Sequence, residues 1–380
     1  MKYYSIMKDR FQRFNSGRVN FFLLAVITVI IFAAVLRITS SVVLPFTISL
    51  LLAIVASPVV KFLGKLHIPR SVSIFMILVF LVGGFAVTGM VLYSSGRVLV
   101  ALYPRYEARL TEIYIFVSRF FELPYDEHLS FLDNIWGQVG VRNRVRILTL
   151  SFTNTFVFFL RDSFMVALFM VFLLSEAVFI REKLDRAFEG PRAEQIIKIS
   201  SDVMTRVTRY LSIKLIISLV TGIIVGIGLK LVGVEFVVVW AVIQFVVNFI
   251  PNIGSIAVGV VTTAFALVQF WPEPIPIVLT ALVMLGTNVT IGSIMEPKIM
   301  GDRLGLSPLV VLVSLLFWGW IWGFAGLILA VPMMAIIKIV CENIPMLEPI
   351  SILLGSRKAA LAAKKRDEET TGGETSGNAD

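Results

Sequence analysis

The amino-acid sequence predicts an all-α polytopic integral membrane protein. We expect about eight transmembrane helices, additional broken or re-entrant hairpins, and an amphipathic helical insert outside the cytoplasm. Of the 380 residues, 57% are hydrophobic and 16% are charged, whereas soluble domains carry about 25% charged residues. Several apolar runs approach or exceed the length of about 20 residues that crosses the hydrocarbon core as a helix. Most basic residues fall between these runs, as expected for loops on the cytoplasmic side.

The same composition argues against several other classes of function. The formal net charge is +9, but the basic residues form no single patch that would bind nucleic acid. His67 and His128 are the only histidines, and neither has metal-ligand spacing; nucleotide-binding and hydrolase motifs are also missing. Cys341 is the only cysteine, which excludes an intrachain disulfide. We therefore expect no enzyme, no cofactor, no metal site and no nucleic-acid partner.

The chain divides into seven predicted regions. The start carries five basic residues against one acidic residue, which predicts a cytoplasmic N-terminus. The end is charged and then rich in Gly, Thr and Ser, which predicts a partly disordered cytoplasmic tail. The regions are 1–20, the basic N-terminus; 21–93, transmembrane helices one to three; 94–150, the extracytoplasmic amphipathic helical region; 151–180, transmembrane helix four; 181–214, a cytoplasmic helical connection; 215–340, a core with broken helices, interpreted below as the transport core; and 341–380, the tail.

In the first half, apolar runs at 21–36, 41–60 and 71–93 predict the first three helices. Pro45 and Pro58 lie in the second run and are expected to kink or end it.

The region 94–150 is amphipathic rather than continuously apolar. Apolar residues recur from Leu99 to residue 120 at steps of four and three, which places them on one helical face. A second amphipathic stretch follows at 129–139. Two interpretations remain open: a helical pair that lies on the membrane or caps the domain, or a seam for self-association.

The core contains two pairs of short apolar runs, and a break divides each pair. The first pair, 236–250 and 255–270, is separated by a Pro-Asn-Ile-Gly sequence. Each run reaches only roughly 22–24 Å as a helix, short of a hydrocarbon core of about 30 Å. We favour a hairpin, with two short tilted spans as the alternative. The second pair, 309–322 and 324–339, is divided at a Trp-Gly step. An apolar run at 277–294 predicts a span between them. The residues expected to break or hinge these helices are Pro251, Gly254, Gly323, Gly326 and Pro332.

A weak internal repeat connects the two pairs. Offsetting residues 236–259 by 72 positions aligns several identical residues, among them Gly254 with Gly326. Paired broken segments that carry polar side chains are typical of transporter binding sites.

The candidate binding residues are amides. Gln244 and Asn248 are four residues apart and share one helical face, Asn252 lies at the first break, and Asn288 lies in the run 277–294. Amides donate and accept hydrogen bonds without ionising, which suits a neutral hydroxylated or carbonyl-bearing solute. The alternative is contact between helices, worth about 0.6 kcal/mol each.

Glu296 is the candidate residue for coupling. At membrane depth it would need Lys298, Arg303, or a coupling proton or cation as a partner. At the cytoplasmic surface it would be an ordinary exposed carboxylate or part of a structural ion pair. The residues predicted to gate or couple are Glu296, Lys298, Asp302 and Arg303.

The chain resembles the autoinducer-2 exporter family of bacterial membrane permeases. The resemblance is carried by NFIPNIGS at 248–255, MEPKIMGDRLGLSPLVVLVSLLFWGW at 295–320 and GLILAVPMMAIIKI at 326–339. It is strongest to the branch that contains the exporter of the quorum-sensing signal autoinducer-2. The chain departs from the family pattern at Lys214, where many members carry the glutamine of a Gly-Gln pair, and at Ser255, where proline is frequent. The resemblance implies an inner-membrane permease with about eight spans, broken helices and a homo-oligomeric assembly.

These observations predict a secondary carrier or facilitator in the bacterial plasma membrane. It would export a small polar solute, with an autoinducer-2-like signal as the leading candidate. Since no nucleotide-binding motif is present, any energy coupling would use protons or sodium. One alternative is a sodium (cation)/proton antiporter. Another is a non-transporting membrane scaffold or assembly factor that uses 94–150 as its docking surface.

Overall fold

The computed structural model of the protein describes residues 16–121, 141–177, 179–187, 191–251, 253–300 and 305–356. No strand occurs among them, and only an isolated bridge joins Leu306 to Gly355. The prediction of an all-α fold is confirmed. The helices are α2 (Ser16–Ile38), α3 (Ser40–Lys65), α4 (Arg70–Phe121), α6 (Val141–Glu176), α7 (Ile180–Ala187), α8 (Pro191–Val232), α9 (Val237–Val247), α10 (Ile253–Phe270), α11 (Pro274–Thr287), η1 (Asn288–Met295), α12 (Glu296–Met300), α13 (Pro308–Glu342), η2 (Pro345–Leu347) and α14 (Glu348–Leu354).

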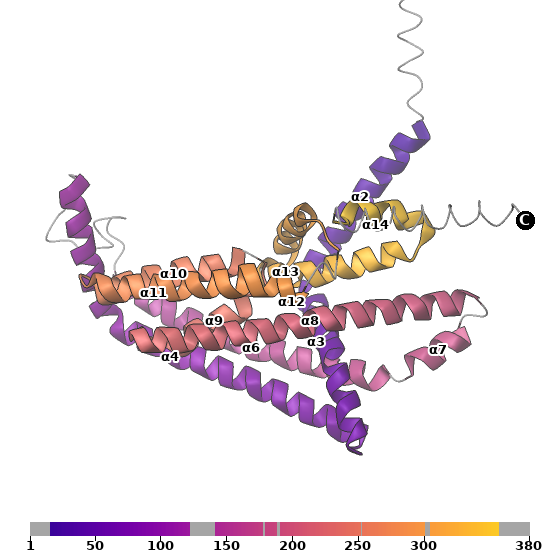
Figure 1. Ribbon diagram of the computed structural model, residues 1–380, viewed down its shortest axis with the longest axis horizontal. Coiled ribbons are helices and arrows are strands. Elements are labelled where there is room, and N and C mark those ends of the chain that lie inside the picture. The colour runs from indigo at the N-terminus through magenta and orange to yellow at the C-terminus, as the bar shows by residue number, and fades with distance from the viewer. Residues whose placement is uncertain are drawn as a thin grey trace, which may run out of the picture.

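The long helices α4, α6, α8, α10 and α11 run along the longest axis of the molecule, and α2 and α3 cross them (Figure 1). Seven helices in the described part of the chain are long and apolar enough to cross a membrane, judged by length and composition. Large apolar side chains cover their outer faces, including Phe80, 84% exposed, and Leu231, 82% exposed. Water penalises such a surface, whereas lipid tails do not. The polytopic membrane prediction is therefore confirmed.

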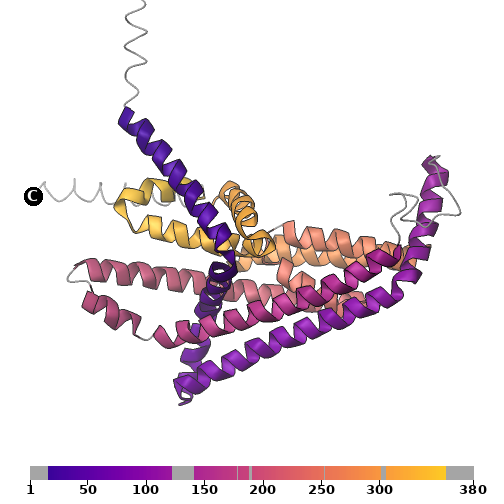
Figure 2. The ribbon, with the colours of Figure 1, turned by 180° about the vertical axis from the view of Figure 1, so that it is seen from behind.

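Several helices continue past the boundaries expected from polarity. Pro45 and Pro58 both lie inside α3, so neither ends it. Helix α4 crosses the boundary expected at 93/94 without a break, and its C-terminal part, which contains Pro104, bends (Figure 2) and packs against α10. Helix α8 likewise passes through 214/215. The amphipathic stretch 129–139 lies outside the described residues.

The largest buried apolar cluster lies where α13 meets α3 and α8. It includes Leu51 from α3, Val207 and Leu211 from α8, and Trp318 and Leu329 from α13. This packing holds the second broken pair against the bundle.

Both broken pairs fold back on themselves. Helix α13 contains a non-helical step at Trp322 (φ −120°, ψ 16°) and Gly323 (φ 59°, ψ −136°). Its two halves are joined by a hydrogen bond of 2.8 Å from the Ser314 hydroxyl to the carbonyl oxygen of Ala330. Glycine is suited to the positive φ at position 323 because it has no Cβ. A break at this step was expected from the sequence.

The first hairpin is formed by the short helix α9 and by α10. A Cβ atom added at Gly254 would lie 2.0 Å from the carbonyl oxygen of Val247, so the two helices meet at backbone contact. Pro251 lies in the turn between them.

Helix α11 does not end as an α-helix. It continues into η1, an eight-residue π-helix, and then into α12. π-Helical turns are rare and occur frequently at functional sites. The sequence pattern at 277–294 had indicated only a regular span.

Candidate functional site

A small polar cavity lies where α8, the α9–α10 break and the η1–α12 segment meet. Its volume is about 50 Å³. The lining residues are Lys214, Asn248, Ile250, Ser255, Ile256, Asn288, Gly292, Ser293 and Glu296. We refer to this space as the polar cavity. It contains amide, hydroxyl, carboxylate and ammonium groups within helices whose outer faces are apolar.

An ion pair crosses the polar cavity. The Lys214 ammonium of α8 lies 2.5 Å from Oε1 of Glu296, the first residue of α12. The Lys214 side chain is 1% exposed and that of Glu296 is 18% exposed. From the sequence we expected Lys298, Arg303, or a coupling proton or cation as the partner of Glu296. Lys298 is exposed instead, and Arg303 lies outside the described residues.

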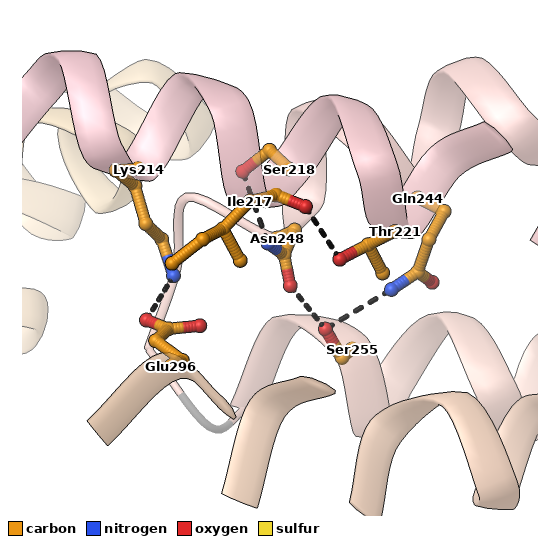
Figure 3. Close-up of polar contacts among 8 residues, drawn as sticks. All are labelled: Lys214, Ile217, Ser218, Thr221, Gln244, Asn248, Ser255 and Glu296. Carbon is orange, nitrogen blue, oxygen red and sulfur yellow. Dashed lines mark hydrogen bonds and ion pairs between the residues drawn. The ribbon is translucent and has the colours of Figure 1, made fainter. Parts of the chain in front are cut away.

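A chain of side-chain hydrogen bonds lies beside the ion pair (Figure 3). The Gln244 amide nitrogen donates to the Ser255 hydroxyl at 3.0 Å, and that hydroxyl donates to Oδ1 of Asn248 at 2.8 Å. The Asn248 amide nitrogen then donates to the Ser218 hydroxyl of α8 at 2.9 Å. The expectation that Gln244 and Asn248 share one face is met, because both bind Ser255.

Helix α8 presents its polar side chains at regular steps. Lys214, Ser218 and Thr221 are four and three residues apart, so they share one face, which points toward Glu296 and Ser255 in Figure 3. The Thr221 hydroxyl donates to the carbonyl oxygen of Ile217 at 2.7 Å and is therefore satisfied within its own helix. Sequence reasoning did not single out Lys214 as a site residue, although this stripe of polar residues in an apolar run was a usable signal.

Asn288 belongs to the π-helical segment and lines the polar cavity. A Cβ atom at Gly292 would lie 2.9 Å from Oδ1 of Asn288, so this glycine leaves room for the amide. Three other predicted residues, Asn252, Asp302 and Arg303, lie outside the described part of the chain.

The second break does not line the polar cavity. Paired breaks are typical of one shared binding site, but no cavity-lining residue belongs to α13. The α13 break packs against α2 instead: Nε1 of Trp322 donates to the carbonyl oxygen of Leu36 at 3.2 Å, and the Arg37 guanidinium lies 4.8 Å from the ring centre of Trp320. Gly323 and Gly326 shape this hairpin, and Pro332 is buried in its second half. The physical reason for the difference is that α13 is held in the apolar cluster with α3 and α8.

The polar cavity combines neutral hydrogen-bonding groups with one ion pair. Among the residues that the structure describes, no group of three or more His, Cys, Asp or Glu side chains is arranged to hold a metal ion. The cavity offers hydrogen-bond donors and acceptors beside an internally balanced pair of charges.

Comparison with known proteins agrees with a transport role. The family model described as "AI-2E family transporter" matches residues 22–346. A protein of Borreliella burgdorferi named "Putative transport protein" is 33% identical over 90% of this chain and 93% of its own length, and a Haemophilus influenzae protein of the same name is 32% identical over 88% and 95%. The Escherichia coli K12 protein named "AI-2 transport protein TqsA" is 28% identical over 84% of this chain and 91% of its own. The chain therefore belongs to the AI-2E transporter family and is a multi-pass membrane transporter.

Proposed function

We propose that this transporter exports a small hydroxylated or carbonyl-bearing solute across the bacterial plasma membrane, through the polar cavity at the α9–α10 break. An autoinducer-2-like signal is the leading candidate, which would give the protein a part in quorum sensing. The name of the Escherichia coli relative supports this choice of solute. The termini would lie in the cytoplasm, and the transporter would act as a homo-oligomer.

The single observation that carries the proposal is the junction of a helix break with a polar cavity. Asn248 and Ser255 line the cavity and also form the hydrogen bonds across the break. Discontinuous helices are tolerated at membrane depth where they are buried in protein or line a wet cavity. In transporters such breaks form the solute site.

The polar cavity has room for molecules the size of water. A buried water needs at least about 10–15 Å³ of such space, so about 50 Å³ holds a few waters. A larger solute would bind after the hydrogen bonds between α9 and α10 open, and its hydroxyl groups would replace them. Oε1 of Gln244 is buried and has no partner among the described residues, so it would be an acceptor for such a hydroxyl.

The experiment is uptake and efflux of labelled autoinducer-2 in proteoliposomes that contain the purified protein. Each measurement is made without a gradient, with a proton gradient and with a sodium gradient. We expect flux of the solute above that of protein-free vesicles, and saturation as its concentration rises. Absence of protein-dependent flux for autoinducer-2 and for a panel of small polyols would contradict the proposal.

A cation/proton antiporter is the second candidate, and the position of Glu296 favours it. Its carboxylate lines the polar cavity and is 18% exposed, so it would accept a proton or a cation from that space. Antiport predicts that Glu296→Gln abolishes sodium-driven proton movement in vesicles. Solute transport predicts that Asn248→Ala has the larger effect, measured as solute flux.

A further inference from the structure

Lys214 is the largest side chain that is fully buried in the described residues, and its charge is directed at one carboxylate. Placing an ammonium and a carboxylate away from water is costly unless each compensates the other. Apolar residues at both positions would avoid this cost. The pair therefore calls for a functional explanation.

We propose that Lys214 is a built-in counter-cation that occupies the place of a coupling ion. With the Lys214 ammonium beside Glu296, the polar cavity needs no proton or sodium to balance its charge. The solute would then move down its own gradient, without a coupled cation. This inference rests on the proposed solute transport and specifies how it is energised.

The surroundings of Glu296 support this assignment. Among the described residues that line the polar cavity, Lys214 is the only basic one and Glu296 the only acidic one. Tyr210 lies one turn earlier on α8, is buried, and lies in the electrostatic field of Glu296. Lys298 on α12 is exposed. A neutral residue at position 214 would therefore leave Glu296 without a buried positive charge.

With a neutral residue at position 214, the oxygen atoms left in the polar cavity would be of the kind that bind a monovalent cation. The carboxylate of Glu296 would face a cavity that also contains the side-chain oxygens of Asn248, Ser255 and Asn288. Hard cations prefer such oxygen ligands. A proton on Glu296 would balance the charge equally well, so sodium and the proton are the two occupants to distinguish.

The test compares the wild type with Lys214→Gln and with the charge-balanced double variant Lys214→Gln/Glu296→Gln in proteoliposomes. Solute flux is measured with and without sodium at fixed pH, and at several pH values without sodium. Between these conditions, we expect the flux of the wild type and of the double variant to change less than about 2-fold. The flux of Lys214→Gln should change about 5-fold or more with sodium or with acid pH. Lys214→Met serves as a second variant if the glutamine variant does not fold.

Lys338→Gln is the matched control. Lys338 is also a buried, ion-paired lysine: its side chain is 6% exposed and lies 2.8 Å from Glu342, outside the polar cavity. This variant loses a buried ion pair but should gain no dependence on sodium or pH. If the flux of Lys338→Gln depended on sodium or pH as strongly as that of Lys214→Gln, the inference would be wrong.

A second readout separates this inference from the proposed function. Sodium should raise the unfolding temperature of Lys214→Gln in detergent and leave that of the wild type unchanged, since only a bound ligand stabilises the folded state. If the occupant is a proton, acid pH rather than sodium should raise the unfolding temperature of Lys214→Gln. If no solute is transported but this stabilisation is seen, the proposed solute is wrong and the inference stands. If wild-type protein accumulates solute using a sodium or proton gradient, or if Lys214→Gln responds to neither cation, the inference is wrong.

Discussion

A Cβ atom at Gly326 would lie 1.8 Å from the carbonyl oxygen of Trp318, so the two halves of α13 meet backbone to backbone. The first hairpin has the same feature, because a Cβ at Gly254 would lie 2.0 Å from the carbonyl oxygen of Val247. These two glycines are the pair aligned by the 72-residue offset. The internal repeat therefore corresponds to a shared structural role, close approach at a helix break.

Replacing either glycine by alanine should destabilise the protein. Overpacking costs about 1–3 kcal/mol where a neighbour can move, and the neighbours of Gly254 and Gly326 are backbone atoms. Thermal unfolding in detergent should show a lower midpoint for both variants. The control is Gly286→Ala in α11, where an added Cβ meets nothing within 4 Å. Equal midpoints for all three variants would disprove the close contact.

Glu296→Gln should destabilise the protein more than the double variant Lys214→Met/Glu296→Gln. The single change leaves the buried Lys214 ammonium unpaired, and breaking a buried pair in this way costs about 3–5 kcal/mol. The double change removes both charges and should recover most of that loss. Denaturation in detergent measures the difference, and an additive result from the two single changes would show that the pair is not coupled.

Tyr106→Phe should cost more stability than Arg105→Gln. Both residues of α4 bind Glu235 in the turn between α8 and α9. Arg105 is 54% exposed, and exposed ion pairs contribute about 0–1 kcal/mol. The buried Tyr106 hydroxyl donates to a carboxylate, and such bonds contribute about 1.5–3 kcal/mol. Unfolding midpoints test the order, and a larger loss for Arg105→Gln would reverse our account of this contact.

Ser255→Ala should weaken solute binding. It removes a hydroxyl that lines the polar cavity and that would bond to the solute once its bonds to Gln244 and Asn248 open. Loss of one such bond should raise the half-saturating solute concentration about 5–10-fold. Thr280→Val is the control, because the Thr280 hydroxyl is also buried but donates to Pro276 of its own helix. Equal effects of the two variants on flux would argue against a solute site at Ser255.

Much of the fold could be predicted from the sequence, because apolar runs, prolines and glycines act locally. The Trp-Gly step of α13 and the shared face of Gln244 and Asn248 are examples. Helices α4 and α8 run on across the region boundaries expected at 93/94 and 214/215, since backbone hydrogen bonds continue where side chains change character. The pairing of Lys214 with Glu296 spans 82 residues and depends on how α8 packs against α12. No local pattern contains that information.

The most direct test of the central claim is protection of the polar cavity by solute. Ser293 lines the cavity, and a Ser293→Cys variant can be made in a Cys341→Ala background because Cys341 is the only cysteine. A small methanethiosulfonate reagent then reports access to position 293, with Lys65→Cys, at the exposed end of α3, as the control. Saturating autoinducer-2 should slow labelling at 293 about 5-fold or more and leave position 65 unchanged. Equal labelling rates at 293 with and without solute, in protein that transports it, would show that the solute passes elsewhere.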